Sequence, residues 1–351
     1  MQPGFEVPIL ILGYNRPDLM AGLLDHLREI RPLNVYVALD GPRYQKPGDF
    51  EKCSATRNIV ASQIDWPCHV EFKASPVNLG CKLGVSSGIS WFFSRVEEGI
   101  IMEDDCRPTP EFYTFCAAML AKYRNTAQVM MIGGANFQLG KVRGDASYYF
   151  SKFTHIWGWA TWRRSWALYD LNMSGLDTFL ESEDFAQICP HEDERNFWRP
   201  IFTAVRDGKI DTWDYQLTYS AWKANRLSII PNVNLVTNVG FRSDGTHVTD
   251  PTSARANVPT ATLGTPLRHP GSIIQDVEAD RFTFTSGNEA TTNSSTKSDS
   301  EVSPLKREKK ESKKSKSESA EARELRSIKG SFVWRLARGL FSIEKRLRSF
   351  K

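Results

Sequence analysis

Short apolar runs that each end in a polar loop most limit the fold of this 351-residue sequence. Val7–Leu12 leads into Tyr14-Asn15-Arg16-Pro17, and Asn34–Leu39 leads into Asp40-Gly41-Pro42. Continuous apolar runs with β-branched residues are typical of parallel strands buried on both faces. The leucines between the two runs have helical spacing: Leu19, Leu23, Leu24 and Leu27. The order strand, helix, strand predicts a doubly wound α/β unit.

The same alternation continues downstream. Strands are expected at Val70–Ala74, Gly99–Met102 and Val129–Ile132, with helices at about 83–97 and 111–123 between them. Polar residues follow the carboxyl ends of these strands, which is the edge at which open α/β sheets bind ligands. We therefore expect a Rossmann-like, mostly parallel sheet flanked by helices, with its functional loops at that edge.

Three adjacent carboxylates, Glu103, Asp104 and Asp105, follow the Gly99–Met102 run. Adjacent carboxylates repel one another, so a protein keeps them at a sheet edge only where a cation or several donors offset the repulsion. Mg²⁺ and Mn²⁺ prefer oxygen ligands and commonly join one or two carboxylates to nucleotide phosphates. A solvated acidic turn is the alternative, and the buried strand before the triplet favours the metal.

The loops after the first two strands favour a nucleotide. Asn15, Arg16 and Asp40 are expected at the same edge as the acidic triplet, where amide, guanidinium and carboxylate groups can bind a base and ribose. Ordinary turn chemistry around Pro17 and Pro42 explains either loop alone equally well. Neither loop carries GxGxxG or GxxxxGK[ST], which argues against a dinucleotide cofactor or a P-loop.

Charge and cysteine content exclude other classes of protein. The net charge is +4, but residues 291–351 hold 17 Lys and Arg against 8 Asp and Glu, so residues 1–290 carry −5. An acidic body argues against a nucleic-acid-binding domain. The 6 cysteines form no CxxC pair, so we expect reduced, mostly buried thiols.

The seven tryptophans within 148–222 suit a half-open substrate lobe, although core packing explains most of them.

The C-terminal region changes composition. Residues 273–328 are rich in Ser, Thr, Lys and Glu and predict a disordered charged linker. Residues 329–351 regain an amphipathic pattern with basic residues on the other faces. Such a helix can lie on an anionic membrane surface, or it can dock on its own domain or on a partner. With no signal peptide or spanning segment recognised, we expect a cytosolic protein, peripheral at the inner face of the membrane if the helix binds lipid.

Seven segments together resemble the GT-A fold nucleotide-sugar glycosyltransferases, close in pattern to the N-acetylglucosaminyltransferase I family and to bacterial family 2-type enzymes. The segments are YNRP, ALDGPR, NLGCKLGVSSGISWFF, GIIMEDDCRPTPEFYTFC, IWGWATWRRSW, TWDYQ and IIPNVNLVTNVG, all within about 7–247. The EDD block is the most specific, since the family's metal motif is a similar strand-end triplet. The resemblance implies a glycosyltransferase domain at 1–272, with a nucleotide half at about 1–140 and an acceptor half at about 141–272.

The resemblance also implies roles for single residues. Asp105 and His247, the latter in RSDGTH, would bind Mn²⁺ or Mg²⁺, and Asp214 in TWDYQ would be the general base. The nucleotide-contacting residues would be Asn15, Arg16, Asp40, Lys82, Glu103 and Asp104. The family often has two successive acidic residues where this sequence has Asp214-Tyr215.

The expected activity is therefore an inverting, metal-dependent transfer of a sugar from a nucleotide-diphosphate donor, with UDP-sugars weakly favoured, to a glycan or lipid-linked hydroxyl. A sugar-phosphate nucleotidylyltransferase is the alternative within the same chemistry. It would favour a Gly- and Lys-rich loop after the first strand, which Tyr14–Pro17 does not supply. A membrane-associated binding protein without catalysis is the alternative outside it.

Overall fold

The computed structural model describes residues 4–242, 253 and 255–296. The strands are β1 (Ile9–Gly13), β2 (Asn34–Leu39), β3 (His69–Ala74), β4 (Glu98–Glu103), β5 (Cys106–Pro108), β6 (Val129–Gly133), β7 (Tyr148–Ser151), β8 (Trp159–Trp162), β9 (Leu227–Pro231) and β10 (Val236–Asn238). The helices are α1 (Pro17–Ile30), α2 (Asp49–Gln63), α3 (Gly80–Arg95), α4 (Pro110–Tyr123), α5 (Arg163–Trp166), α6 (Leu176–Leu180), α7 (Glu183–Ile188), α8 (Glu192–Arg206), α9 (Asp214–Lys223) and α10 (Val277–Thr296).

A large sheet forms the centre, in the order β3-β2-β1-β4-β8-β6-β9-β7. The pairs β1–β2, β1–β4, β2–β3 and β6–β9 are parallel, whereas β8 and β7 pair antiparallel with their neighbours. The predicted mostly parallel α/β sheet flanked by helices is confirmed, since only β7 and β8 run against the other six strands of this sheet. A second, two-stranded sheet joins β5 to β10.

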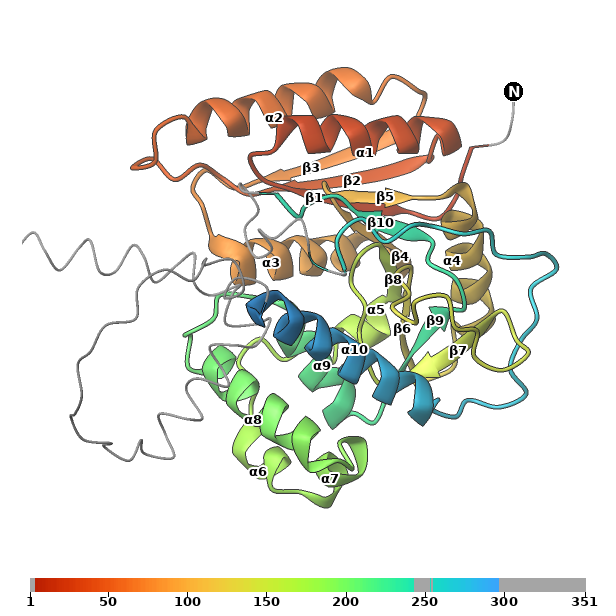
Figure 1. Cartoon of the computed structure of the whole chain (residues 1–351). Coiled ribbons are helices and arrows are strands. Elements are labelled where there is room, and N and C mark those ends of the chain that lie inside the picture. Colours follow the sequence, from red (N-terminus) through yellow and green to blue (C-terminus); the bar gives the residue numbers. More distant parts are fainter. Residues whose placement is uncertain (1–3, 243–252, 254, 297–351) are drawn as a thin grey trace, which may run out of the picture.

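Alternate side chains of the inner strands face two separate cores. In β1, Ile9 and Ile11 pack with α1 and α4, while Leu10 and Leu12 pack with α3 and the helices beyond it. Each of these four side chains is buried, as a strand covered on both faces requires. Figure 1 shows the resulting layers, with α1 and α2 on one side of β1–β3 and α3 on the other.

Tryptophans of the middle segment serve mainly as core. Trp159, Trp162, Trp213 and Trp222 are buried almost completely, and Trp159 stacks on Trp213 with ring centroids 5.7 Å apart. Trp157 is partly exposed. Packing against α6–α9, rather than an open aromatic lobe, explains most of this density.

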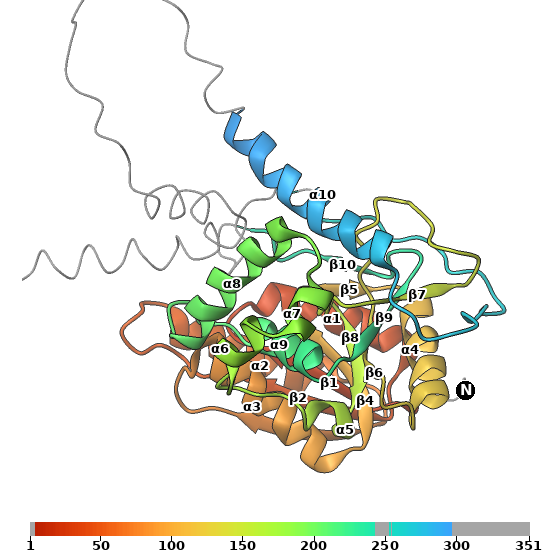
Figure 2. The same cartoon turned by 90° about the horizontal axis from the view of Figure 1, so that it is seen from below.

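A helix replaces the first part of the predicted linker. α10 begins at Val277 and lies against β7, with Ala279 and Phe284 buried. Figure 2 shows it crossing the molecule beside β7, β9 and α8. This helix differs from the disordered linker expected from residue 273, because the buried side chains of Ala279, Asp280, Thr283 and Phe284 attach its first part to the core despite the low apolar content of the segment. The predicted helix at 329–351 lies outside the described residues.

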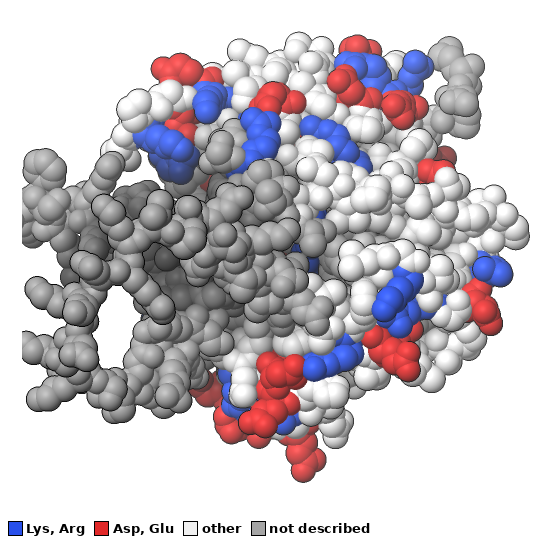
Figure 3. Space-filling model, viewed as in Figure 1, with Lys and Arg blue, Asp and Glu red and all other residues white. Residues whose placement is uncertain are grey.

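The structure agrees with the expectation of mostly buried thiols. All six cysteines are free, and four of them are buried. Among these residues there is no helix long and apolar enough to cross a membrane. On the face drawn in Figure 3, basic and acidic side chains of the described residues lie interspersed rather than in separate fields.

Candidate functional site

The sheet topology brings six strand ends to one edge. Because β1, β2, β3, β4, β6 and β9 run in the same direction, their carboxyl ends lie on the same side. The loops that follow β1, β2 and β4 carry the predicted Asn15, Arg16, Asp40 and the acidic triplet. The sequence-based expectation that these residues share an edge is met for the described residues.

Arg16 pairs with the acidic triplet. Its Nη1 lies 3.1 Å from Asp105 Oδ2, and its Nε and Nη2 donate to the two oxygens of Asp104, the Nε bond being 3.2 Å. The Arg16 side chain is 15 % exposed and that of Asp104 only 1 %. Burial opposes the guanidinium charge, but the carboxylates outweigh it and raise the pKa of Arg16. Arg16 is thus bound by carboxylates of the protein itself, and it connects the loop after β1 to the residues that follow β4.

Asp105 is also held by the small β5–β10 sheet. Asn238 Nδ2 donates to Asp105 Oδ1 at 3.2 Å, and Asn238 Oδ1 accepts from the Gly240 amide at 2.7 Å. A Cβ on Gly240 would lie 2.3 Å from Asp105 Oδ2, so a glycine is needed there. The segment 236–240 therefore fixes the orientation of the Asp105 carboxylate.

Glu103 differs from its two neighbours. Burial, together with the charges of Asp105, Asp104 and Asp214, raises its pKa to about 8, and Arg16 opposes this only partly. Burial likewise raises the pKa of Asp104 to about 6 despite Arg16. If all three carboxyls of the triplet are ionised, their negative charge therefore exceeds what Arg16 neutralises.

A divalent cation would relieve this excess. The described residues contain no group of three or more His, Cys, Asp or Glu arranged to hold a metal ion. Mg²⁺, however, is commonly held by one or two carboxylates together with substrate phosphates and waters. The hard oxygen donors of Glu103 and Asp105 fit that mode of binding, in which the cation arrives with a phosphorylated ligand. His247 lies outside the described residues.

Asp49 is a structural centre of the site that the sequence analysis missed. Its carboxylate, 1 % exposed, accepts hydrogen bonds from Tyr14 Oη, from Asn15 Nδ2 at 2.6 Å and from the Arg43 amide at 2.8 Å. Burial opposes ionisation, but these donors lower its pKa well below the usual value. Asp49 thereby joins the loops after β1 and β2 at the start of α2. It also binds the side-chain amide of Asn15, which the sequence predicted to contact a nucleotide.

Asp40 stabilises its own surroundings. Its carboxylate accepts from the Gly41 amide at 2.8 Å, the Leu79 amide at 2.9 Å and Asn78 Nδ2 at 2.8 Å. Burial raises its pKa, although these donors oppose the shift. Asp40 therefore closes the loop that leads into α3.

Asp211 completes the start of α3 from the other side. Its Oδ2 accepts from the Cys81 amide at 3.0 Å and its Oδ1 from the Lys82 amide at 3.1 Å. The amides of the first turn of a helix have no partners inside the helix. At the start of α3, the carboxylates of Asp40 and Asp211 act as these missing partners. Both residues lie far from α3 along the chain, so a local sequence pattern does not reveal them.

Asp214 is the first residue of α9 and lies close to the triplet. Thr212 Oγ1 donates to its Oδ1, and its charge contributes to the raised pKa of Glu103. The charges of Glu103, Asp214, Asp211 and Asp40 all act on the thiol of Cys81 and help burial raise its pKa. These four carboxylates therefore surround the first turn of α3.

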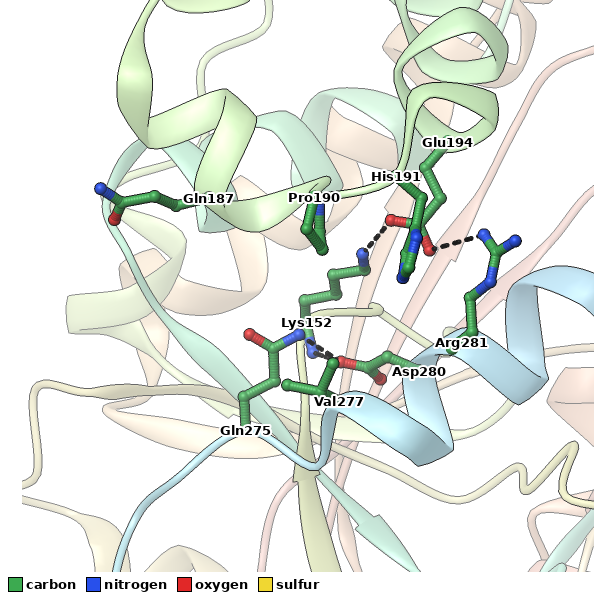
Figure 4. Close-up of a pocket in the computed structure, with 9 residues that line it drawn as sticks. All are labelled: Lys152, Gln187, Pro190, His191, Glu194, Gln275, Val277, Asp280 and Arg281. Atoms are coloured by element: carbon green, nitrogen blue, oxygen red, sulfur yellow. Dashed lines mark hydrogen bonds and ion pairs between the residues drawn. The ribbon is translucent and has the colours of Figure 1, made fainter.

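A separate small pocket lies between α8 and α10. Lys152 Nζ contacts Glu194 Oε2 at 2.7 Å, and the Lys152 amide donates to Asp280 Oδ2 at 3.0 Å. Figure 4 shows these side chains together with Arg281 pointing toward one another. The cavity volume is about 30 Å³, which is room for a water molecule or two rather than a substrate. These contacts attach α10 to the core.

The sequence matches no protein-family model and no curated protein. Partial structural similarity exists to UDP-glucose pyrophosphorylase with UDP-glucose, at 8 % identity and TM-score 0.35, over 64 % of this chain and 90 % of that one. Mannose-1-phosphate geranyltransferase from Thermus thermophilus has 12 % identity and TM-score 0.36, over 65 % and 73 %. HddC from Yersinia pseudotuberculosis has 9 % identity and TM-score 0.29, over 45 % and 77 %.

Identities and TM-scores this low carry no argument about the function of this chain. The Rossmann-like architecture predicted from the sequence is confirmed by the sheet topology. The narrower GT-A glycosyltransferase assignment is not confirmed.

Proposed function

We propose that this chain is an enzyme of nucleotide-sugar chemistry that binds a nucleotide diphosphate sugar at the carboxyl edge of β1, β2 and β4 and transfers the sugar to a hydroxyl group. The observation that carries the proposal is the gathering of Glu103, Asp104, Asp105 and Asp214 at one edge of the sheet, where Arg16 is already paired with Asp104 and Asp105. Burial, together with these neighbouring carboxylates, raises the pKa of Glu103 to about 8. A divalent cation carrying a diphosphate suits such a group of carboxylates.

Each residue near the edge has a role in this proposal. Asp105 and Glu103 would hold Mg²⁺ or Mn²⁺, and the ion when bound would neutralise charge developing on the departing diphosphate. Asp214 accepts the proton of the acceptor hydroxyl, and Thr212 orients its carboxylate. The hydroxyl oxygen forms its bond to the anomeric carbon as the bond to the diphosphate breaks. A single displacement of this kind inverts the anomeric configuration.

A sugar-phosphate nucleotidylyltransferase is the second candidate. It would use the same sheet edge and the same cation, and the names of the partly similar structures agree with it. It must also neutralise a triphosphate, and Arg16, the one cation in the Tyr14–Pro17 loop, is already bound to Asp104 and Asp105. On this ground we favour sugar transfer.

One assay separates the two reactions. Purified chain is incubated with Mn²⁺ or Mg²⁺ and either UDP-, GDP- or dTDP-sugars, or nucleoside triphosphate plus sugar 1-phosphate. Release of nucleoside diphosphate, with an acceptor or by slow hydrolysis, supports sugar transfer. Release of pyrophosphate from triphosphate and sugar phosphate instead would establish the nucleotidylyltransferase. Retention of the donor's anomeric configuration, measured by NMR on the product, would refute the single displacement.

Asp214 is tested in the same assay. We expect Asp214→Asn to lower turnover ~10²–10⁴-fold, because the general base is lost, and to leave nucleotide affinity unchanged. Asp184→Asn, an exposed aspartate of α7, is the matched control and should turn over like the wild type. Normal turnover of Asp214→Asn would assign the base elsewhere.

A further inference from the structure

The first turn of α3 has no cap of its own. Its N-cap residue is Leu79, whose side chain makes no capping hydrogen bond, and its first turn contains no acidic residue. An N-terminus of this kind leaves unpaired amides and a partial positive charge. Asp211, 130 residues away from Cys81 along the chain, supplies the carboxylate.

The fit between Asp211 and α3 is close. Gly80 has a φ of +79°, which favours glycine, and a Cβ at this position would lie 2.6 Å from Asp211 Oδ2. Both carboxylate oxygens are used, one on each of the Cys81 and Lys82 amides. Gly80 thus allows the carboxylate to approach the helix end directly.

Asp211 joins two parts of the candidate site. It lies in the connection between α8 and α9, three residues before Asp214. On its other side is the helix that carries Lys82 and whose first turn is surrounded by Glu103 and Asp40. A shift of this connection away from α3 would therefore also shift Asp214 relative to the acidic triplet.

We propose that Asp211 is a positioning residue: by binding the amides of Cys81 and Lys82 it holds the start of α9, and with it Asp214, in register with the nucleotide-binding edge. The inference rests on the proposed function for its effect on turnover. The contact itself does not depend on that function.

Asp211→Asn and Asp211→Ala test the contact first. Amide hydrogen exchange should accelerate at both Cys81 and Lys82 in Asp211→Ala, which has no acceptor, and at one of the two amides at least in Asp211→Asn, which keeps a single acceptor oxygen. Asp207→Asn is the matched control, since Asp207 lies in the same connection but pairs with Arg206 and Lys209. It should leave exchange at both amides unchanged. Unchanged exchange in the Asp211 variants would overturn the proposal.

Turnover then tests positioning. Displacement of a reacting group by about 1 Å can lower rates ~100-fold, so kcat of Asp211→Asn should fall ~10–100-fold with the KM for the donor within twofold of wild type. Because Asp211 acts through Asp214, adding Asp211→Asn to Asp214→Asn should lower kcat no further. Equal fractional losses in both backgrounds, or unchanged kcat despite faster exchange, would overturn positioning. An inactive wild type that binds no nucleotide sugar would instead refute the proposed function, and the exchange result would still report on the contact.

Discussion

Replacing Arg16 should destabilise the fold strongly. Its guanidinium lies 3.1 Å from Asp105 and donates twice to Asp104, whose side chain is 1 % exposed. At an effective dielectric constant of about 20, one such contact has a gross Coulomb energy of about 5 kcal/mol. Desolvation offsets part of this, and removing one partner of a buried pair typically costs roughly 3–5 kcal/mol. We expect Arg16→Met to lower the free energy of unfolding by that amount.

Urea unfolding followed by tryptophan fluorescence at pH 8 measures the loss. Arg124→Met is the matched control, since Arg124 pairs with Glu98 but is 59 % exposed, and exposed pairs contribute about 1 kcal/mol or less. A double-mutant cycle with Asp104→Asn isolates the coupling between the two side chains.

The pH dependence gives a second check on Arg16. Burial already raises the pKa of Asp104 to about 6 although Arg16 opposes the shift, so without the guanidinium the Asp104 carboxyl should bind its proton still more tightly in the folded state than in the unfolded state. The stability of Arg16→Met should therefore fall as pH rises from about 5 to 8 relative to wild type. A loss below about 1 kcal/mol at pH 8, or a loss that does not shrink at pH 5, would refute the reasoning.

Three further predictions concern other parts of the molecule. UDP with Mn²⁺ should raise the melting temperature of the wild type but not of Asp105→Ala, and EDTA should remove the effect; equal shifts with and without metal would contradict a cation at Asp105. Burial raises the pKa of Asp280 to about 6, so folded chain binds this proton more tightly than unfolded chain and stability should fall between about pH 4 and 6, by ~3 kcal/mol. Asp280→Asn should lack this component in denaturant titrations across that range, and an identical slope in both proteins would contradict it. Residues 329–351 should cosediment the full chain with anionic but not neutral liposomes, whereas a chain ending at 296 should stay in solution; equal binding of both would exclude the predicted interfacial helix.

The strands of the central sheet could be predicted because burial on both faces leaves continuous apolar runs, as in β1 and β4. α2 could not be predicted in the same way. The positions that it buries are Asp49, Cys53, Thr56 and Val60, so its inward face carries little apolar pattern. α10 escaped prediction for a similar reason, since Ser, Thr, Asn and Gly dominate its sequence.

The sequence predicted which edge of the sheet carries the candidate site, but it did not predict which side chains contact one another there. Sequence placed Asn15, Arg16 and Asp40 beside the triplet, because strand ends of a parallel sheet share an edge. It assigned these groups to a ligand, whereas Asp49, Asp104 and the α3 amides bind them. Partners 34 to 88 residues apart are set by tertiary packing, and nothing in the local pattern reports them.

The N-terminal amides of α3 are already hydrogen-bonded within the protein, and this limits how a diphosphate can bind at this edge. Helix N-termini commonly receive phosphate through their free amides, but Asp40 and Asp211 already accept from Leu79, Cys81 and Lys82. A diphosphate that approached this turn would meet two carboxylates rather than donors. Its charge would therefore have to be balanced on the Glu103 and Asp105 side, which is where a divalent cation fits the oxygen donors. The same two carboxylates that complete α3 thus make the proposed activity depend on metal.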